Sequence, residues 1–114
     1  MELVKGCPLD VALQFLARRW LGHIVWTLGR NGETRFGDLR KKVPDRISPR
    51  MLALRLRELE KLGLVARTDR KTKVPHVSYA LTETGARVDC MLQKLEKEVA
   101  ANALPRNLAA LLAP

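Results

Sequence analysis

Three basic side chains and one leucine recur at helical spacing in the middle of the chain, at Arg50, Leu54, Arg57 and Lys61. At about 100° per residue they fall on one side of a helix. An arginine guanidinium donates paired hydrogen bonds to phosphate or to guanine, and an apolar side chain can contact the methyl group of thymine. This pattern favours contact with a DNA groove. The simpler alternatives are a basic helix face in solvent and a lone exposed leucine.

The segment that must position these side chains has helix signals at both ends. Ser48 is a good N-cap, Pro49 fits the first helical position, and Gly63 is the expected C-cap. A helix of about four turns, roughly 20 Å long, suits a major groove about 12 Å wide. The other side of this helix should face the core through an apolar stripe of Leu52, Leu56 and Leu59, with Met51 and Leu62 at its margins.

The net charge of the chain is concentrated around this segment. The whole sequence carries a formal net charge of +9 and has a pI near 10.3. Residues 35–73 hold 13 basic and 5 acidic side chains, whereas the remaining residues are almost balanced. Such a concentration indicates an anionic partner, with nucleic acid first and an acidic membrane surface second.

Length and composition predict one soluble globular domain. The chain has 114 residues, of which 46% are hydrophobic and 29% charged, and it contains no repeat or low-complexity segment. Charged residues interrupt the first 20 positions, and the longest uncharged run, at 20–29, is too short to span a membrane. We therefore expect a cytoplasmic protein without membrane attachment.

The sequence contains no recognisable motif for catalysis or metal binding. It has no glycine-rich phosphate loop, no nucleophile elbow and no cluster of histidines with carboxylates. His23 and His76 are isolated, and Cys7 and Cys90 form neither a metal-binding nor a CxxC pattern. We expect no catalytic site, no metal and no cofactor.

The sequence before the basic helix predicts three further helices. Two should cover 8–19 and 20–28, with the turn residues GRNG ending the second. An extended piece at 34–36 should lead into a short helix that Gly37 caps and that ends before Pro44.

The sequence after the basic helix predicts a β-ribbon and a long helix. Two strands should lie within 64–70 and 76–81, joined by a basic tip, KTKVP. Thr82 should cap the last helix and Pro105 should stop it. The buried stripe of that helix is predicted to consist of Val88, Met91, Leu92, Leu95 and Val99.

This order of elements predicts a mainly helical α+β fold, a winged helix-turn-helix in which the basic helix enters the major groove. Within one domain, 1–114, the helix-turn-helix should span 34–63 and the wing 64–82. Segments 1–33 and 83–114 should supply core and dimerisation helices. The first helix is apolar on two sides and the tail is apolar, so both carry more apolar surface than a monomer of this size should expose.

Several stretches resemble the HxlR family of bacterial transcription regulators, which is related to the MarR group. They are CPLDVALQFLARRW, TRFGDLRKKVPDRISPRMLALRLRELEKLGLVART and VPHVSYALTETG, within a match over about 7–95. The resemblance implies a dimeric winged-helix DNA-binding protein whose N- and C-terminal helices build the dimer. The chain departs from the family at Ala53 and Leu54, where polar residues are common, and at Gly37, where a hydroxyl cap is more usual.

The candidate DNA contacts follow from the basic helix, the strand before it and the wing. Homodimers should place them on a palindromic double-stranded operator. The alternatives are a winged-helix module for protein–protein contact and a non-specific nucleic-acid binder. The candidate residues are Arg35, Ser48, Arg50, Ala53, Leu54, Arg57, Lys61, Arg70, Lys71 and Lys73.

Cys7 is a candidate redox-sensing residue. It stands at the start of the first helix, near Lys5, where the positive end of the helix dipole favours a thiolate. Some HxlR-type regulators use a cysteine at the matching position to sense electrophiles or oxidants, which implies such an effector here. The alternative is a packed, inert thiol. Cys90 lies on a line with Ala86 and Ala101, so close helix packing is favoured over a redox partnership with Cys7.

Overall fold

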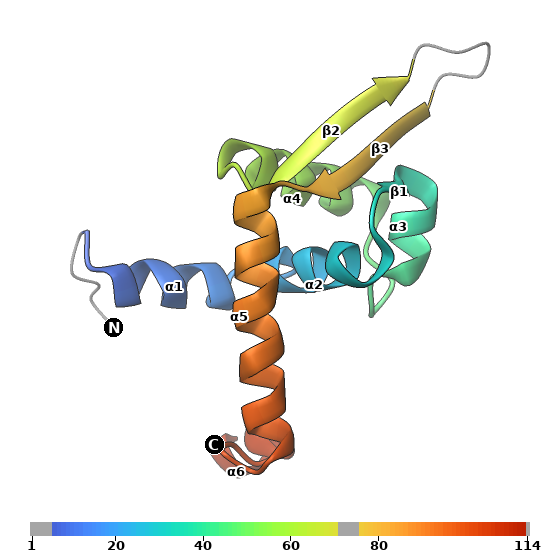
Figure 1. Ribbon diagram of the computed structural model, residues 1–114. Coiled ribbons are helices and arrows are strands. Elements are labelled where there is room, and N and C mark those ends of the chain that lie inside the picture. Colours follow the sequence, from blue (N-terminus) through green and yellow to red (C-terminus); the bar gives the residue numbers. More distant parts are fainter. Residues whose placement is uncertain (1–5, 71–75, 114) are drawn as a thin grey trace.

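A computed structural model of the protein describes residues 6–70 and 76–113 (Figure 1). A three-stranded antiparallel sheet of order β1-β3-β2 packs with the helices. The arrangement confirms the predicted mainly helical α+β fold with a β-ribbon wing, and no helix in the described part is long and apolar enough to cross a membrane. The elements in chain order are α1 (Pro8–Ala17), α2 (Leu21–Asn31), β1 (Thr34–Arg35), α3 (Phe36–Lys42), α4 (Pro49–Lys61), β2 (Val65–Arg70), β3 (His76–Leu81), α5 (Glu83–Ala100) and α6 (Leu108–Leu112).

The hydrophobic core lies between α2, α3, α4 and the sheet. Its most deeply buried side chains include Ile24 and Val25 of α2 and Leu39 of α3. Helix α5 crosses α2, and its C-terminal half extends away from the core, whereas α1 projects to one side (Figure 1). The core is therefore built by α2, the helix-turn-helix and the sheet, and α1 contributes no buried residue.

Helix α4 forms as predicted. Ser48 is its N-cap, and its Oγ accepts a hydrogen bond from the backbone N–H of Met51 at 3.1 Å. At the other end Gly63 has φ +76°, and the N–H of Leu64 donates to the carbonyl of Leu59 at 3.0 Å, a closing geometry that favours glycine. The stripe of Leu52, Leu56 and Leu59 is fully buried, which confirms that prediction, whereas the marginal Leu62 is exposed.

Four predicted helix ends were wrong by a few residues. Helix α1 ends at Ala17, short of the predicted position 19. Helix α2 continues through Gly29 to Asn31, and the left-handed Gly32, with φ +69°, ends it instead. Helix α3 begins at Phe36 with Arg35 as its N-cap, so Gly37 lies inside the helix and does not cap it. Helix α5 stops at Ala100, because the chain turns at the left-handed Asn102 before it reaches Pro105.

The predicted buried stripe of α5 was partly wrong. Val88, Leu92 and Val99 are half-buried, but Met91 is 60% and Leu95 44% exposed. Helical periodicity identifies the apolar side of α5, but the core of one chain covers only part of that side.

Helix α5 buries Gly85 and one charged residue, Asp89. Its Oδ2 accepts hydrogen bonds from Nη2 of Arg30 at 2.6 Å and from Nε2 of Gln93 at 3.0 Å. A Cβ atom at Gly29 would overlap the Asp89 carboxyl group, so the absence of a side chain at Gly29 lets the two helices approach. Farther along α5, Oε2 of Glu96 accepts a hydrogen bond from the indole N–H of Trp26 in α2. Helix α5 is thus fastened to α2 at two points.

Replacing Gly29 by alanine should destabilise the protein by about 1–3 kcal/mol, because the new methyl group collides with a buried, hydrogen-bonded carboxylate. Gly22→Ala in the same helix is the matched control. A Cβ at Gly22 meets no atom within 4 Å, so this change should stabilise by about 0.5–1 kcal/mol. Urea unfolding of both variants measures the difference, and equal effects would contradict the close approach at Gly29.

Candidate nucleic-acid interface

The outer face of α4 carries cations without internal partners. Arg50, Arg57 and Lys61 are exposed, and none forms an ion pair with a residue that the structure describes. Leu54 lies among them at 45% exposure, and Ala53 is half-buried beside it. The structure therefore brings five of the predicted contact residues together on one side of a single helix.

Another arginine of α4 has a structural role. The Arg55 side chain is 15% exposed and pairs with Glu58 at 2.5 Å, and Glu58 also accepts a hydrogen bond from Arg18 at 3.1 Å. Partial burial raises the pKa of Glu58, but the hydrogen bonds from Arg18 and Arg55 outweigh it and hold the pKa below its ordinary value. Glu58 thus stays charged at neutral pH and joins the end of α1 to α4.

A carboxylate also fastens the wing, through Ser78 of β3 and Arg70 at the end of β2. Oε2 of Glu33 accepts hydrogen bonds from Ser78 at 2.8 Å and from Arg70 at 2.9 Å, and these bonds lower the pKa of Glu33. Arg70 is therefore tied to Glu33, although its side chain is 54% exposed. Of the other predicted wing residues, Lys71 and Lys73 lie outside the described residues.

Two predicted contact residues hold local structure as well. Arg35 is exposed, pairs with Ser78 across the sheet and precedes α3 as its N-cap residue. Ser48 uses its oxygen to cap α4, which leaves its hydroxyl hydrogen free to donate. Both residues lie at helix starts, so their side chains are positioned by the helix-turn-helix itself.

The cysteines lie far from α4 in the sequence, on the two helices outside the core. Cys7 is the N-cap of α1 and is half-buried, and Cys90 is exposed on α5. Neither forms a disulfide within the described part of the chain. In the same part, no three His, Cys, Asp or Glu side chains gather closely enough to hold a metal ion.

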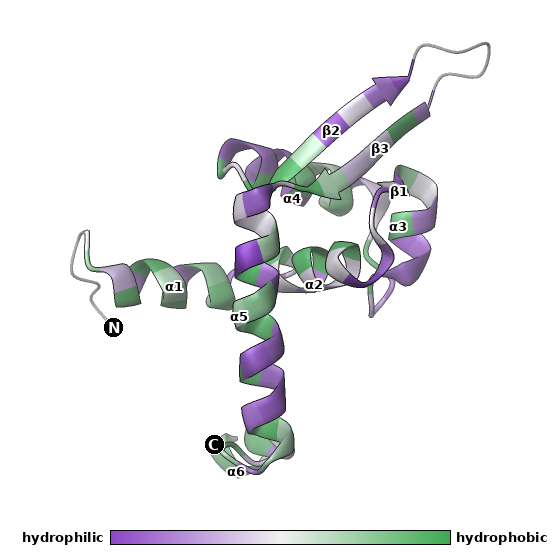
Figure 2. Ribbon diagram, viewed as in Figure 1, coloured by the Kyte–Doolittle hydropathy of each residue, from purple (hydrophilic) through white to green (hydrophobic). Residues whose placement is uncertain are grey.

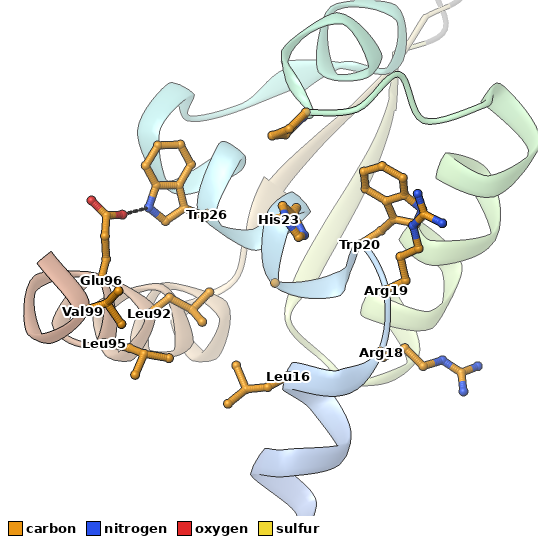
Figure 3. A pocket seen from close by; sticks show the side chains of 12 residues that line it. Leu16, Arg18, Arg19, Trp20, His23, Trp26, Leu92, Leu95, Glu96 and Val99 are labelled. Atoms are coloured by element: carbon orange, nitrogen blue, oxygen red, sulfur yellow. Dashed lines mark hydrogen bonds between the residues drawn. The ribbon is translucent and has the colours of Figure 1, made fainter. Parts of the chain in front are cut away.

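A hollow of about 420 Å³ lies where α1, α2 and α5 meet (Figure 3). The indole of Trp26 points toward α5 and donates to Glu96 at 2.9 Å, while Trp20 lies under the guanidinium of Arg19 at 4.7 Å. Most of the remaining lining is aliphatic. Leu16 reaches the hollow from α1, and Leu92, Leu95 and Val99 reach it from α5.

A second hollow, of about 660 Å³, lies between α1 and α5. Phe15 and Leu21 border it on one side, and Val88 and Met91 border it on the other. Together the two hollows make the surface between the projecting helices concave and apolar.

Comparisons with known proteins agree with this architecture. Residues 15–107 match the family model described as HxlR-like helix-turn-helix. The HTH-type transcriptional regulator YdeP of Bacillus subtilis is 41% identical over 81 residues, which make up 71% of this chain and 62% of YdeP.

Two solved structures are also similar. The reduced form of the transcriptional regulator YodB from B. subtilis superposes with a TM-score of 0.71 at 34% identity, over 81% of this chain and 89% of YodB. The redox regulator HypR in its reduced form gives a TM-score of 0.74 at 31% identity, over 84% of this chain and 93% of HypR. YodB has also been solved after diamide treatment and with bound quinone.

Proposed function

Because the chain belongs to the HxlR-like helix-turn-helix family of transcriptional regulators, we propose that it binds a palindromic operator in double-stranded DNA as a homodimer. The observation that carries this proposal is the outer face of α4, where Arg50, Arg57 and Lys61 are exposed and form no ion pair with the residues described at 6–70 and 76–113. Other arginines, such as Arg55 on the inner side of α4 and Arg70 in the wing, are paired with acidic side chains. Cations left free on one face suit an external anion.

The groove contacts divide by chemistry. Arg50 and Arg57 hydrogen-bond base edges, since a guanidinium matches the two acceptors of guanine. Leu54, between them, contacts a thymine methyl group, and Lys61 at the end of α4 contacts phosphate. Arg35 and the wing cations Lys71 and Lys73 add backbone contacts, as does Arg70, whose side chain stays 54% exposed beside Glu33. Ser48 and Ala53 border the groove. In this arrangement the helix selects the sequence and the wing adds affinity.

The dimer follows from apolar surface that one chain leaves uncovered. Leu9 and Val11 of α1 are 65% and 58% exposed, and Met91 of α5 is 60% exposed. Short helix α6 exposes Leu111 and Leu112, and Figure 2 shows α1 and α6 as mostly hydrophobic ribbons outside the core. A two-fold dimer that buries these helices places two copies of α4 on successive half-sites, about 34 Å apart.

Regulation through Cys7 is part of the same proposal. The half-buried Cys7 is the N-cap residue of α1, one of the helices that build the proposed dimer. The similar proteins YodB and HypR have been solved in chemically distinct redox states. With a quinone, the Cys7 sulfur forms a bond to a ring carbon and the ring takes up the thiol proton, giving a hydroquinone thioether. The adduct displaces α1 and changes the spacing of the two α4 helices.

Arg57→Ala should weaken binding to the operator by about 1–3 kcal/mol and binding to random duplex by less, because Arg57 contacts bases. Lys71→Ala should weaken both alike, because a phosphate contact carries no sequence information. Fluorescence anisotropy on a duplex selected from a random pool measures both. Equal losses for both variants on both duplexes would show that α4 is not the reading helix. No binding by the wild type would favour the protein–protein module, and equal affinity for all duplexes would favour a non-specific binder.

Light scattering at micromolar concentration should give about twice the chain mass of 12.9 kDa. Met91→Glu should shift this mass toward the monomer and weaken operator binding, because it places a charge in the proposed apolar interface. The exposure of Met91 keeps the core of each chain intact. Lys94→Glu, at an exposed polar position of α5, is the control and should remain dimeric. A monomeric wild type would remove the basis for palindromic recognition.

Treatment with a quinone should release the wild type from its operator, and Cys7→Ser should stay bound because it lacks the thiol. Cys90→Ser controls for the second cysteine and should respond as the wild type does. Operator binding before and after treatment, with the adduct located by mass spectrometry, is the measurement. If the wild type keeps full affinity, or if Cys7→Ser is also released, Cys7 is not the sensor, although the α4 contacts would be unaffected.

A further inference from the structure

The turn between α3 and α4 has an unusual backbone. Asp45 and Arg46 are consecutive residues other than glycine, and both have positive φ, of 61° and 48°. L-residues adopt this region reluctantly, so the conformation persists only where the surroundings enforce it. Here the buried Val43 and Ile47 anchor both sides of the turn, and Nε of Arg40 donates to the Ile47 carbonyl at 3.2 Å. The turn is therefore fixed, with its two central residues on the surface.

A strongly basic hollow of about 680 Å³ lies against this turn. Four cations line it, three in the last turn of α3 and one in the turn that follows, and among the described lining residues one carboxylate accompanies them. The charged lining residues are Arg40, Lys41, Lys42, Asp45 and Arg46. Gly37 also lines the hollow, and a Cβ atom there would meet nothing within 4 Å, so the space beside α3 is open.

The charge of this hollow is not neutralised internally. Arg40 donates to a backbone carbonyl, which leaves its terminal nitrogens available, and Lys42 donates to the neutral amide oxygen of Asn31 at 3.2 Å. Lys41 and Arg46 are exposed and form no ion pair with any residue of the described ranges 6–70 and 76–113. The hollow therefore presents uncompensated positive charge at a fixed place in the fold.

The position of the hollow relative to α4 indicates which anion it would bind. Pro49, the first residue of α4, is part of its lining, and Arg50 of the outer face of α4 is the next residue. A helix of 13 residues is about 20 Å long, whereas the major groove is about 12 Å wide, so the ends of α4 reach the sugar–phosphate backbones that border the groove. The hollow lies at one of these ends.

We propose that the hollow is a backbone-phosphate site, in which Lys41 and Arg46 hold a phosphate of the strand that borders the groove occupied by α4. This inference rests on the proposed DNA binding and adds to it a contact outside both α4 and the wing. Because the turn is rigid, a phosphate held there sets the depth and register of α4 in the groove. None of the candidate contacts from the sequence includes this turn, although the run RKK before Pro44 was a visible signal.

The test uses variants chosen to keep the fold. Arg46→Asn removes the charge and introduces the residue that tolerates a left-handed backbone best after glycine. Lys41→Gln removes the second cation from an exposed helix position. Gly37→Glu introduces a carboxylate into the open hollow, in the first turn of α3, where an acidic residue is favourable. Lys94→Gln, an exposed cation on α5, is the matched control.

Binding to operator and random duplex is measured by anisotropy between about 0.05 and 0.2 M salt. Arg46→Asn and Lys41→Gln should each reduce the slope of log K against log[salt] by about 1 per protomer. Each should also weaken binding about eightfold per contact at about 0.1 M salt, equally on both duplexes. Gly37→Glu should weaken both complexes, and Asp45→Asn, which removes a carboxylate from the hollow, should strengthen both. Lys94→Gln should leave the slope unchanged.

Three results would overturn the inference. One is an unchanged salt slope for folded Lys41→Gln and Arg46→Asn, and another is a loss confined to the operator, which would mean base contact. The third is saturable calorimetric binding of inorganic phosphate that Lys41→Gln abolishes, which would assign the hollow to a free anion. If the wild type binds DNA with a steep salt slope that these variants do not change, this site fails and the proposed function stands. If the wild type binds no duplex, both the phosphate site and the proposed function fail.

Discussion

The rotation of α4 about its axis is the constraint on which the rest of the DNA-facing surface depends. Leu52, Leu56 and Leu59 are fully buried, and each such side chain contributes about 2 kcal/mol by leaving water. With one stripe fixed against the core, the opposite side of the helix has to face solvent. A rotation of even one residue position would expose a leucine and bury an arginine, which is unfavourable on both counts. The core therefore determines which cations are presented.

Ion pairs then separate structural cations from available ones. Three acidic side chains serve internal junctions: Glu58 joins α1 to α4, Glu33 pairs with Arg70 of the wing, and Asp89 joins α5 to α2. At these junctions the arginines Arg18, Arg30 and Arg55 form ion pairs inside the molecule. Those of the outer face of α4 form none with the described residues, so the formal excess of +9 becomes a directed surface charge.

The parts that the sequence predicted well are the local ones. Ser48 and Gly63 act within a few residues of their own helix, so the bounds and the buried side of α4 could be derived from spacing alone. Asp89 could not, because its partner Arg30 is 59 residues away and the pair forms only where α5 crosses α2. Gly29 was interpreted as a helix terminator, whereas it permits that crossing. The exposure of Met91 was missed for a related reason, since periodicity does not reveal what covers an apolar side.

Both tryptophans of the chain belong to the junction of α2 with its neighbours, and this gives the protein a built-in optical label. Trp20 is 6% exposed beneath Arg19, whereas Trp26 is 37% exposed, with its N–H on Glu96 of α5 and the guanidinium of Arg30 over its ring at 5.0 Å. The fluorescence of the protein therefore has a component from Trp20 that is shielded from solvent and a component from Trp26 that is sensitive to it. A change in the angle between α2 and α5 alters the fluorescence of Trp26 first. The orientation of α5 relative to α2 can therefore be followed in unlabelled protein.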